Sequence, residues 1–357
     1  MTPANLTEEE KVYFSLKGLY EGFGYRQYRM RKFEEYSLYS ENKNFLKSKD
    51  IITFSDLNGK LLALKPDVTL SIVKNTRLDR GQRRKLYYRE SVYRTDGGKQ
   101  FKEISQIGLE CLGDIDVYSQ LEVLALAAES LKAVGGGYVI DISHMGVIDG
   151  VMEECGLSAF PEQLSGCIKS KNMHDLPEVC RKAGLAEDKI SKLCTLLDTK
   201  GGYRVQLEAL RNLFKNKKCL SAADELEALL SGLEKSGERG FNLDFSVIND
   251  VTYYNGVVFQ GYLEKFPRVV LSGGRYDNLV KKFCGDIGGT GFALYPDELG
   301  YYYQKQPEYD ADILLLYGDE QPYEVFLKAK ELISQGNTVR VAKSVPENLR
   351  FAEIVKV

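Results

Sequence analysis

The start of the chain has the clearest helical pattern. Between residues 8 and 24, apolar side chains recur every three to four positions, as one face of a helix requires. Thr7 and Glu10 have the spacing of a capping box, in which each side chain bonds the other residue's backbone N–H. Three consecutive glutamates at 8–10 would also stabilise the positive end of the helix. We therefore predict a helix that begins after Thr7.

Strand patterns dominate from residue 28 to residue 142. Two runs of alternating apolar residues flank Gly97-Gly98, which predicts a β-hairpin. The second run carries Gln106 and Glu110, which should point to the same face because they are four residues apart on a strand. A carboxylate beside an amide suits a small ligand with an ammonium or imidazole N–H, although an ordinary solvated sheet face would contain the same residues.

Helical patterns interrupt and follow these strands. We expect helices around 68–84 and 115–134, the second ended by three glycines. Residues 146–235 then carry helical patterns rich in Leu, Ala, Glu and Lys, before strands return at 241–272. After Pro307 the pattern predicts one strand, one helix and one strand. We interpret the basic run 77–85 as a solvated helix face, with an anionic ligand or acidic partner as the alternative.

Composition limits the class of protein. The chain has 357 residues, of which 43% are hydrophobic and 28% charged, so it is long enough for a large domain and one or two smaller units. Its net charge of −3 gives no basic field of the kind that nucleic-acid binders use. Seven cysteines without a C-x-x-C pair suggest reduced thiols. Two isolated histidines predict no metal site, and we read His144 as structural.

We see no sequence signal for secretion or membrane insertion. The first residues have neither the charged nor the apolar region of a signal peptide, and no apolar run reaches the ~20 residues of a membrane span. Phosphate-cradling and Ser/His/Asp motifs were not found either. We expect a cytoplasmic protein with no cofactor and no membrane partner.

Five segments in order resemble the histidyl-tRNA synthetase branch of the class II aminoacyl-tRNA synthetases. They are LLALKPDVTL (61–70), the hairpin, TYYNGVVF (252–259), GGRYDNLV (273–280) and GTGFAL (289–294). The resemblance covers roughly residues 8–303. It implies an α+β fold in which an antiparallel sheet is flanked by helices, with a helical insertion and a short C-terminal βαβ remnant.

The resemblance also implies domain boundaries. Residues 1–145 would form the first part of the synthetase-like core, and 146–240 the helical insertion. Residues 241–306 would complete the core with a degenerate third motif. Residues 307–357 would be a truncated C-terminal α/β segment in place of the domain that reads tRNA, so no tRNA partner is expected.

Family roles transfer to individual positions of this sequence. Asp67, Thr69 and Gln106 would hold the α-ammonium of histidine, although Asp67 is one methylene shorter than the usual glutamate. Glu110 and Tyr254 would face the imidazole, and Tyr276 would line the same pocket. Arg94 matches the arginine that contacts the amino-acid carboxylate and the α-phosphate of ATP. The complete predicted histidine pocket is Asp67, Thr69, Arg94, Gln106, Glu110, Tyr253, Tyr254 and Tyr276.

The positions that would serve ATP depart from the family pattern. Asn249 stands where the synthetases have an arginine, and Glu298 replaces the arginine that clamps the γ-phosphate. Gln100 occupies a basic position of the hairpin. Adenylyl transfer depends on cations placed against developing negative charge, and one such group is worth roughly 10²-fold in rate or more. We therefore expect no catalytic residues and no aminoacylation. Pro296 should disturb the helix that carries residue 298.

A branch of the family matches these departures, namely the regulatory subunits of ATP phosphoribosyltransferase. The resemblance implies a non-catalytic subunit in the first step of histidine biosynthesis, required by a short-form catalytic subunit and involved in feedback by L-histidine. It also implies a homodimer, formed through residues 26–35, within a larger hetero-oligomer. Two alternatives remain open: a paralogue that activates histidine for a non-tRNA acceptor, and a free-standing histidine sensor.

Overall fold

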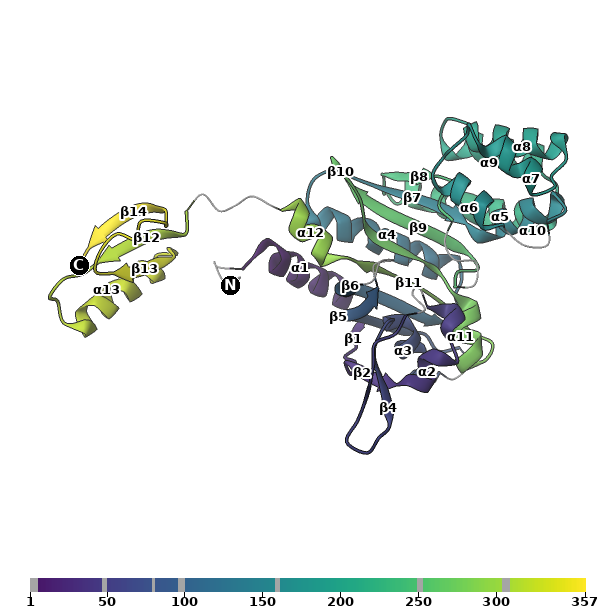
Figure 1. The fold of residues 1–357 in the computed structure, drawn as a ribbon. Helices are drawn as coiled ribbons and strands as arrows, with labels where there is room; N and C mark the ends of the chain where they lie inside the picture. Colours follow the sequence, from purple (N-terminus) through teal and green to yellow (C-terminus); the bar gives the residue numbers. More distant parts are fainter. Residues whose placement is uncertain are drawn as a thin grey trace. The chain divides into compact units, whose positions relative to one another are not determined.

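The computed structural model describes residues 6–46, 50–78, 81–95, 100–157, 161–248, 253–303 and 309–357. The chain divides into two compact units (Figure 1). The larger unit runs from Val12 to Leu299, and the smaller contains Gly300–Val357.

An eight-stranded sheet forms the centre of the larger unit, in the order β1-β5-β6-β11-β10-β9-β7-β8. Neighbouring strands are antiparallel, except that β1 runs parallel to β5 at one edge and β8 parallel to β7 at the other. The strands are β1 (Arg26–Gln27), β5 (Arg84–Thr95), β6 (Phe101–Gly113), β7 (Tyr138–His144), β8 (Phe241–Leu243), β9 (Val257–Leu263), β10 (Phe266–Arg275) and β11 (Gly288–Leu294).

Helices α1 (Glu8–Gly22) and α4 (Val117–Val134) cover one face of this sheet. Tyr20 of α1 hydrogen-bonds Ser130 of α4 at 2.8 Å, and its ring lies edge-on to Phe292 of β11. The predicted capping box is confirmed, because Glu10 N–H donates to the Thr7 hydroxyl at 3.2 Å and Thr7 N–H donates to the Glu10 carboxylate at 2.9 Å.

The opposite face of the sheet carries α3 (Val68–Lys74) and α11 (Asp277–Cys284). The prediction of a helix over 68–84 is wrong beyond Lys74. Asn75 and Thr76 each donate a side-chain hydrogen bond to a carbonyl of the last turn, which ends the helix. Residues from Arg84 onwards belong to β5, and the other described residues of the basic run, 77–78 and 81–83, are not helical either.

A second, three-stranded sheet precedes α3, in the order β2-β4-β3. Its strands are β2 (Phe33–Glu35), β3 (Thr53–Ser55) and β4 (Leu61–Leu64). Helix α2 (Tyr36–Ser40) and a 3₁₀ turn at Lys43–Phe45 lie between β2 and β3. Residues 26–35, the expected dimer contact, therefore contribute to two sheets. Beyond β4, Lys65 is buried against Glu90 of β5, which ties the start of α3 to the hairpin.

Among the described residues, six helices lie between β7 and β8, in the range that the sequence assigned to an insertion apart from the first residue of the first helix (Figure 1). They are α5 (Met145–Glu154), α6 (Glu162–Lys169), α7 (Leu176–Lys182), α8 (Glu187–Asp198), α9 (Tyr203–Leu213) and α10 (Lys217–Lys235). His144 caps α5, because its Nδ1 accepts the Gly146 N–H at 2.9 Å. The structural role predicted for His144 is therefore confirmed.

The smaller unit contains a parallel sheet with the order β13-β12-β14. Its elements are β12 (Ala311–Leu316), α13 (Pro322–Ser334), β13 (Val339–Ala342) and β14 (Phe351–Lys356). Helix α13 buries Val325, Ala329 and Leu332 against Ile313 and Leu315 of β12. The third strand, β14, was not predicted, because its sequence shows little apolar alternation; only Phe351 and Val355 are partly buried.

Candidate functional site: a tyrosine-lined cavity

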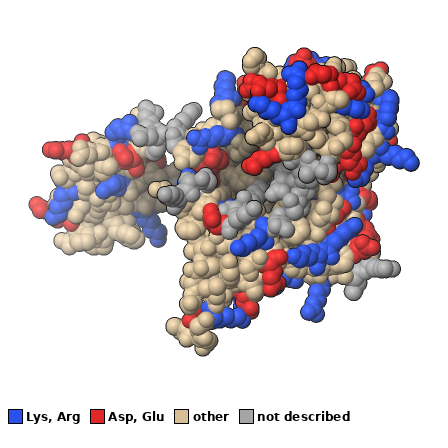
Figure 2. All heavy atoms as spheres, turned by 45° about the vertical axis from the view of Figure 1, so that its right-hand side comes forward, with Lys and Arg blue, Asp and Glu red and all other residues tan. Residues whose placement is uncertain are grey.

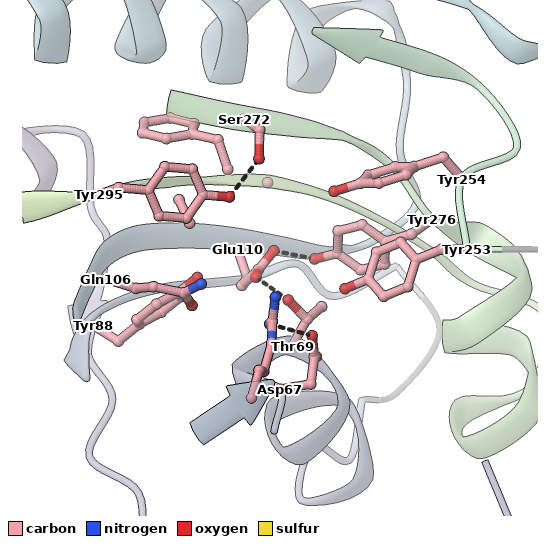
Figure 3. Close-up of a pocket in the computed structure, with 14 residues that line it drawn as sticks. Asp67, Thr69, Tyr88, Gln106, Glu110, Tyr253, Tyr254, Ser272, Tyr276 and Tyr295 are labelled. Carbon is pink, nitrogen blue, oxygen red and sulfur yellow. Dashed lines mark hydrogen bonds and ion pairs between the residues drawn. The ribbon is translucent and has the colours of Figure 1, made fainter. Parts of the chain in front are cut away.

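A small cavity with an interior of about 30 Å³ lies between α3 and the central sheet. All the predicted histidine-pocket residues line it, namely Asp67, Thr69, Arg94, Gln106, Glu110, Tyr253, Tyr254 and Tyr276 (Figure 3). The structure therefore brings together residues that are up to 209 positions apart, counting from 67 to 276. That the cavity binds histidine stays a prediction.

Strand geometry places the two hairpin residues as expected. Gln106 and Glu110 of β6 both line the cavity, whereas Leu109 between them belongs to the buried core. Glu110 lies opposite Gly291 of β11, where any Cβ would overlap the Glu110 carboxylate. A glycine at position 291 thus makes the space that this carboxylate occupies.

Glu110 is the centre of the cavity's hydrogen bonds. Its Oε1 accepts from the Thr69 hydroxyl at 2.7 Å, and its Oε2 accepts from the Tyr276 hydroxyl in a short contact. The pKa of Glu110 is raised to about 8, mainly because the side chain is buried. The two hydrogen bonds lower this pKa, and the nearby Asp67 carboxylate raises it slightly. The side chain is therefore mostly protonated at neutral pH, and a carboxyl retains capacity for a further partner.

Asp67 and Arg94 form the second polar group of the cavity. Asp67 caps α3 by accepting the Leu70 N–H at 2.9 Å, and its other oxygen lies 3.3 Å from the Arg94 guanidinium. Arg94 also donates to the Pro66 carbonyl at 2.6 Å. Asp67, the carboxylate expected to bind a ligand's ammonium, therefore also caps α3 and holds Arg94 in position.

Tyrosine rings form one side of the cavity. Tyr253 packs against Tyr254 with ring centroids 4.7 Å apart, and against Tyr276 at 6.0 Å. Burial raises the pKa of Tyr276 well above 10, so its hydroxyl stays protonated and donates to the carboxylate that it contacts. The rings present a rigid, mainly apolar surface with polar tips.

Several lining residues were missed by the sequence interpretation: Tyr88, Ser272, Gly291, Phe292, Ala293 and Tyr295. Ser272 and Tyr295 bond through their hydroxyls at 2.6 Å, opposite Gln106 and Tyr88 in Figure 3. Strand alternation could have identified Ser272, because it lies two residues before Gly274 in the recognised GGRYD segment. The identity of its partner could not be predicted.

Two positions that depart from the synthetase pattern, Gln100 and Glu298, are not among the residues that line the cavity. Glu298 is in the first turn of α12 (Pro296–Tyr302) and pairs with Arg268 of β10 at 3.1 Å. Gln100 is exposed just before β6, and Asn249 lies outside the described residues. The prediction that Pro296 disturbs the helix is wrong. The helix begins at Pro296, because the N–H that proline lacks has no partner in the first turn.

Other chemistries find little support in the described ranges. They contain no group of three His, Cys, Asp or Glu side chains placed to hold a metal ion. None of their helices combines the length and the apolarity that crossing a bilayer requires. On the face drawn in Figure 2, basic and acidic side chains are interspersed, without an extended basic field.

Comparison with known proteins places the chain in a family. The family model for histidyl-tRNA synthetase matches residues 1–299. An ATP phosphoribosyltransferase regulatory subunit of Halothermothrix orenii is 30% identical over 328 residues, which cover 88% of this chain and 78% of the relative. A histidine–tRNA ligase of Methanocaldococcus jannaschii is 28% identical over an alignment that covers 82% of this chain and 71% of the relative.

A solved structure agrees with these matches. It is an ATP phosphoribosyltransferase regulatory subunit/histidyl-tRNA synthetase from Bacillus halodurans, with a TM-score of 0.80 and 25% identity. The match covers 98% of this chain and 93% of that one. The predicted class II synthetase-like fold is thus confirmed, and the chain belongs to the histidyl-tRNA synthetase family, in the branch of the ATP phosphoribosyltransferase regulatory subunits.

Proposed function

We propose that this chain is a non-catalytic regulatory subunit of ATP phosphoribosyltransferase, the enzyme of the first step of histidine biosynthesis. It activates a short-form catalytic subunit, which transfers the phosphoribosyl group, and it takes part in feedback by histidine. The Halothermothrix orenii relative, 30% identical over most of both chains, supports the assignment.

The observation that carries the non-catalytic role is the ion pair of Glu298 with Arg268. A synthetase needs a cation at position 298 for the γ-phosphate of ATP. Here the position holds a carboxylate, which pairs with Arg268. A negative charge facing a triphosphate adds Coulomb repulsion to the loss of the cation. Adenylate formation should therefore be slower by several orders of magnitude than in an active synthetase.

Histidine is the ligand that the polar groups lining the cavity suit. Asp67 and Glu110 can accept hydrogen bonds from the ammonium and the imidazole, while Arg94 can pair with the carboxylate. Glu110→Ala should weaken histidine binding by about 1–3 kcal/mol, because the imidazole N–H loses its acceptor. Calorimetric titration measures this. Unchanged affinity in the variant would move the histidine site away from this cavity, for example to the interface with the catalytic subunit.

Assembly is part of the proposal. A homodimer that uses residues 26–35 would sit inside a hetero-oligomer with the catalytic subunit. Residues of β1 and β2 in this range are largely exposed, and Arg26 and Gln27 lie at the open edge of the central sheet. An unpaired strand edge is a ready site for association with a second chain.

The test combines the purified chain with a short-form catalytic subunit. Phosphoribosyl transfer to ATP should require both proteins, and the two should co-elute in gel filtration. Added histidine should lower the rate. Equal activity of the catalytic subunit with and without this chain would refute the regulatory role.

The main alternative is a paralogue that activates histidine for a non-tRNA acceptor, and the retained pocket residues favour it. Histidine-dependent exchange of pyrophosphate into ATP by the chain alone would establish that activity and contradict our proposal. A free-standing histidine sensor would bind histidine but neither exchange pyrophosphate nor associate with the catalytic subunit.

A further inference from the structure

One carboxylate of the helical insertion reaches into the synthetase-like core. Glu225 lies on α10 and contacts residues from three core elements. Its Oε1 accepts from the Gln120 amide of α4 at 2.7 Å and lies 3.5 Å from the Arg275 guanidinium at the end of β10. Its Oε2 lies 3.3 Å from Nε2 of His144 at the end of β7. Since His144 Nδ1 already accepts the Gly146 N–H, Nε2 is the nitrogen that donates to Glu225.

Glu225 is charged in this setting. Burial by itself would raise its pKa, but the hydrogen bond and charge of His144, then the hydrogen bond from Gln120 and, least, the positive charge of Arg275 lower it to about 2. The insertion therefore presents a fixed negative charge to the core, and Arg275 is the cation that it meets there.

Arg275 connects the two backbone segments that carry cavity tyrosines. Its side chain lies against Gly256, where a Cβ would come within 2.8 Å of Arg275 Cδ. Its carbonyl accepts the Asn255 N–H at 3.1 Å, and its Nε donates to Asp277 at 2.9 Å. Asp277 N–H in turn donates to the Asn255 side chain at 2.8 Å.

The consequence for the cavity follows from the chain order. Asn255 directly follows Tyr254, and Tyr276 lies between Arg275 and Asp277. Both tyrosines line the cavity. The Arg275 side chain thus contacts Gly256, two residues after Tyr254, and the carboxylate of Asp277, which directly follows Tyr276.

We propose that Glu225 is a positioning residue for the cavity, through which the helical insertion controls ligand binding by holding Arg275 in place. A partner that displaces α10 would loosen Tyr254 and Tyr276 together, and a ligand that orders these rings would favour the docked insertion by the same free energy. The inference rests on the proposed function only in taking histidine as the ligand.

The test uses three single variants of the full chain. Glu225→Ala removes all three contacts, and Glu225→Gln keeps hydrogen-bonding atoms but removes the charge that faces Arg275. The control is Glu227→Ala, which breaks a 2.6 Å ion pair with Arg211 inside the insertion, two residues further along α10. Hydrogen–deuterium exchange of residues 253–257 and 272–277 is measured without ligand, and histidine affinity is measured by calorimetry.

Glu225→Ala should speed exchange in both segments and weaken histidine binding about tenfold, as expected for loss of one charge-assisted contact. Glu225→Gln should fall between Glu225→Ala and wild type, and Glu227→Ala should match wild type in both segments. Two outcomes would overturn the proposal. One is faster exchange in Glu225→Ala only within α10, and the other is an equal rise in exchange of residues 253–257 and 272–277 in Glu225→Ala and Glu227→Ala. If the wild-type chain binds no histidine, the proposed histidine pocket fails, whereas the exchange measurement still decides the role of Glu225, and the assay with the catalytic subunit still decides the regulatory role.

Discussion

The cavity's central carboxyl makes the stability of this protein depend on pH in an unusual direction. Glu110→Gln removes the ionisable group and keeps the shape of the side chain. The pKa of Glu110 rises from 4.5 to about 8 in the folded chain, because the effect of burial exceeds that of the hydrogen bonds from Tyr276 and Thr69, which lower it. Between these two pH values the folded protein holds a proton that the unfolded chain has released.

The sign and size follow from proton linkage. Because the folded state binds the proton more tightly, the contribution of Glu110 is most favourable below about pH 4.5 and is lost as the pH rises to about 8. Each pH unit in this window changes the free energy of unfolding by about 1.4 kcal/mol. Over the whole window, 8 − 4.5 = 3.5 units, the loss approaches about 5 kcal/mol as an upper bound.

Urea unfolding at several pH values between about 5 and 8 measures this contribution. The difference between wild type and Glu110→Gln should shift in favour of the variant by roughly 1 kcal/mol per pH unit. Glu103→Gln, at an exposed position on the same strand, is the matched control and should leave the pH dependence unchanged. Parallel stability curves for wild type and Glu110→Gln would refute the assignment of a protonated, buried carboxyl.

Three further changes test the packing around the site. Gly291→Ala should lower the free energy of unfolding in urea by about 1–3 kcal/mol, because its Cβ would overlap Glu110. Glu90→Gln should lower it by about 3–5 kcal/mol, because the ammonium of Lys65, 1% exposed, loses its counter-charge. Asp116→Ala should cost about 1 kcal/mol at pH 7, since Asp116 caps α4. Burial would raise the pKa of Asp116, but hydrogen bonds lower it to about 2, so that cost should shrink as the pH falls from about 4 towards 2.

Each of these has an outcome that contradicts it. Gly18→Ala, in an exposed stretch of α1 with no atom near its added Cβ, is the control for Gly291 and should stabilise by roughly 0.5–1 kcal/mol. Similar effects of the two alanines would mean that the cavity has room for a Cβ at 291. A pH-independent cost of Asp116→Ala, or a loss under 1 kcal/mol for Glu90→Gln, would show that those carboxylates are not engaged as described.

Short-range features were predictable from the sequence. The capping box at Thr7, the extent of α4 and the shared face of Gln106 and Glu110 depend only on helix and strand periodicity and on local hydrogen bonds. The end of α3 was not predicted, because the side chains of Asn75 and Thr76 favour local bonds that the apolar pattern does not reveal.

The tertiary structure alone decided which groups meet. Glu110 bonds Thr69, 41 residues away, and Tyr276, 166 residues away, and these contacts together with burial set its protonation. In the same way, Glu225 of the insertion meets Arg275 only because α10 packs beside the end of β10. Periodicity fixes the face on which a side chain lies, whereas its partners, its solvation and therefore its charge depend on segments that folding brings together from distant parts of the chain.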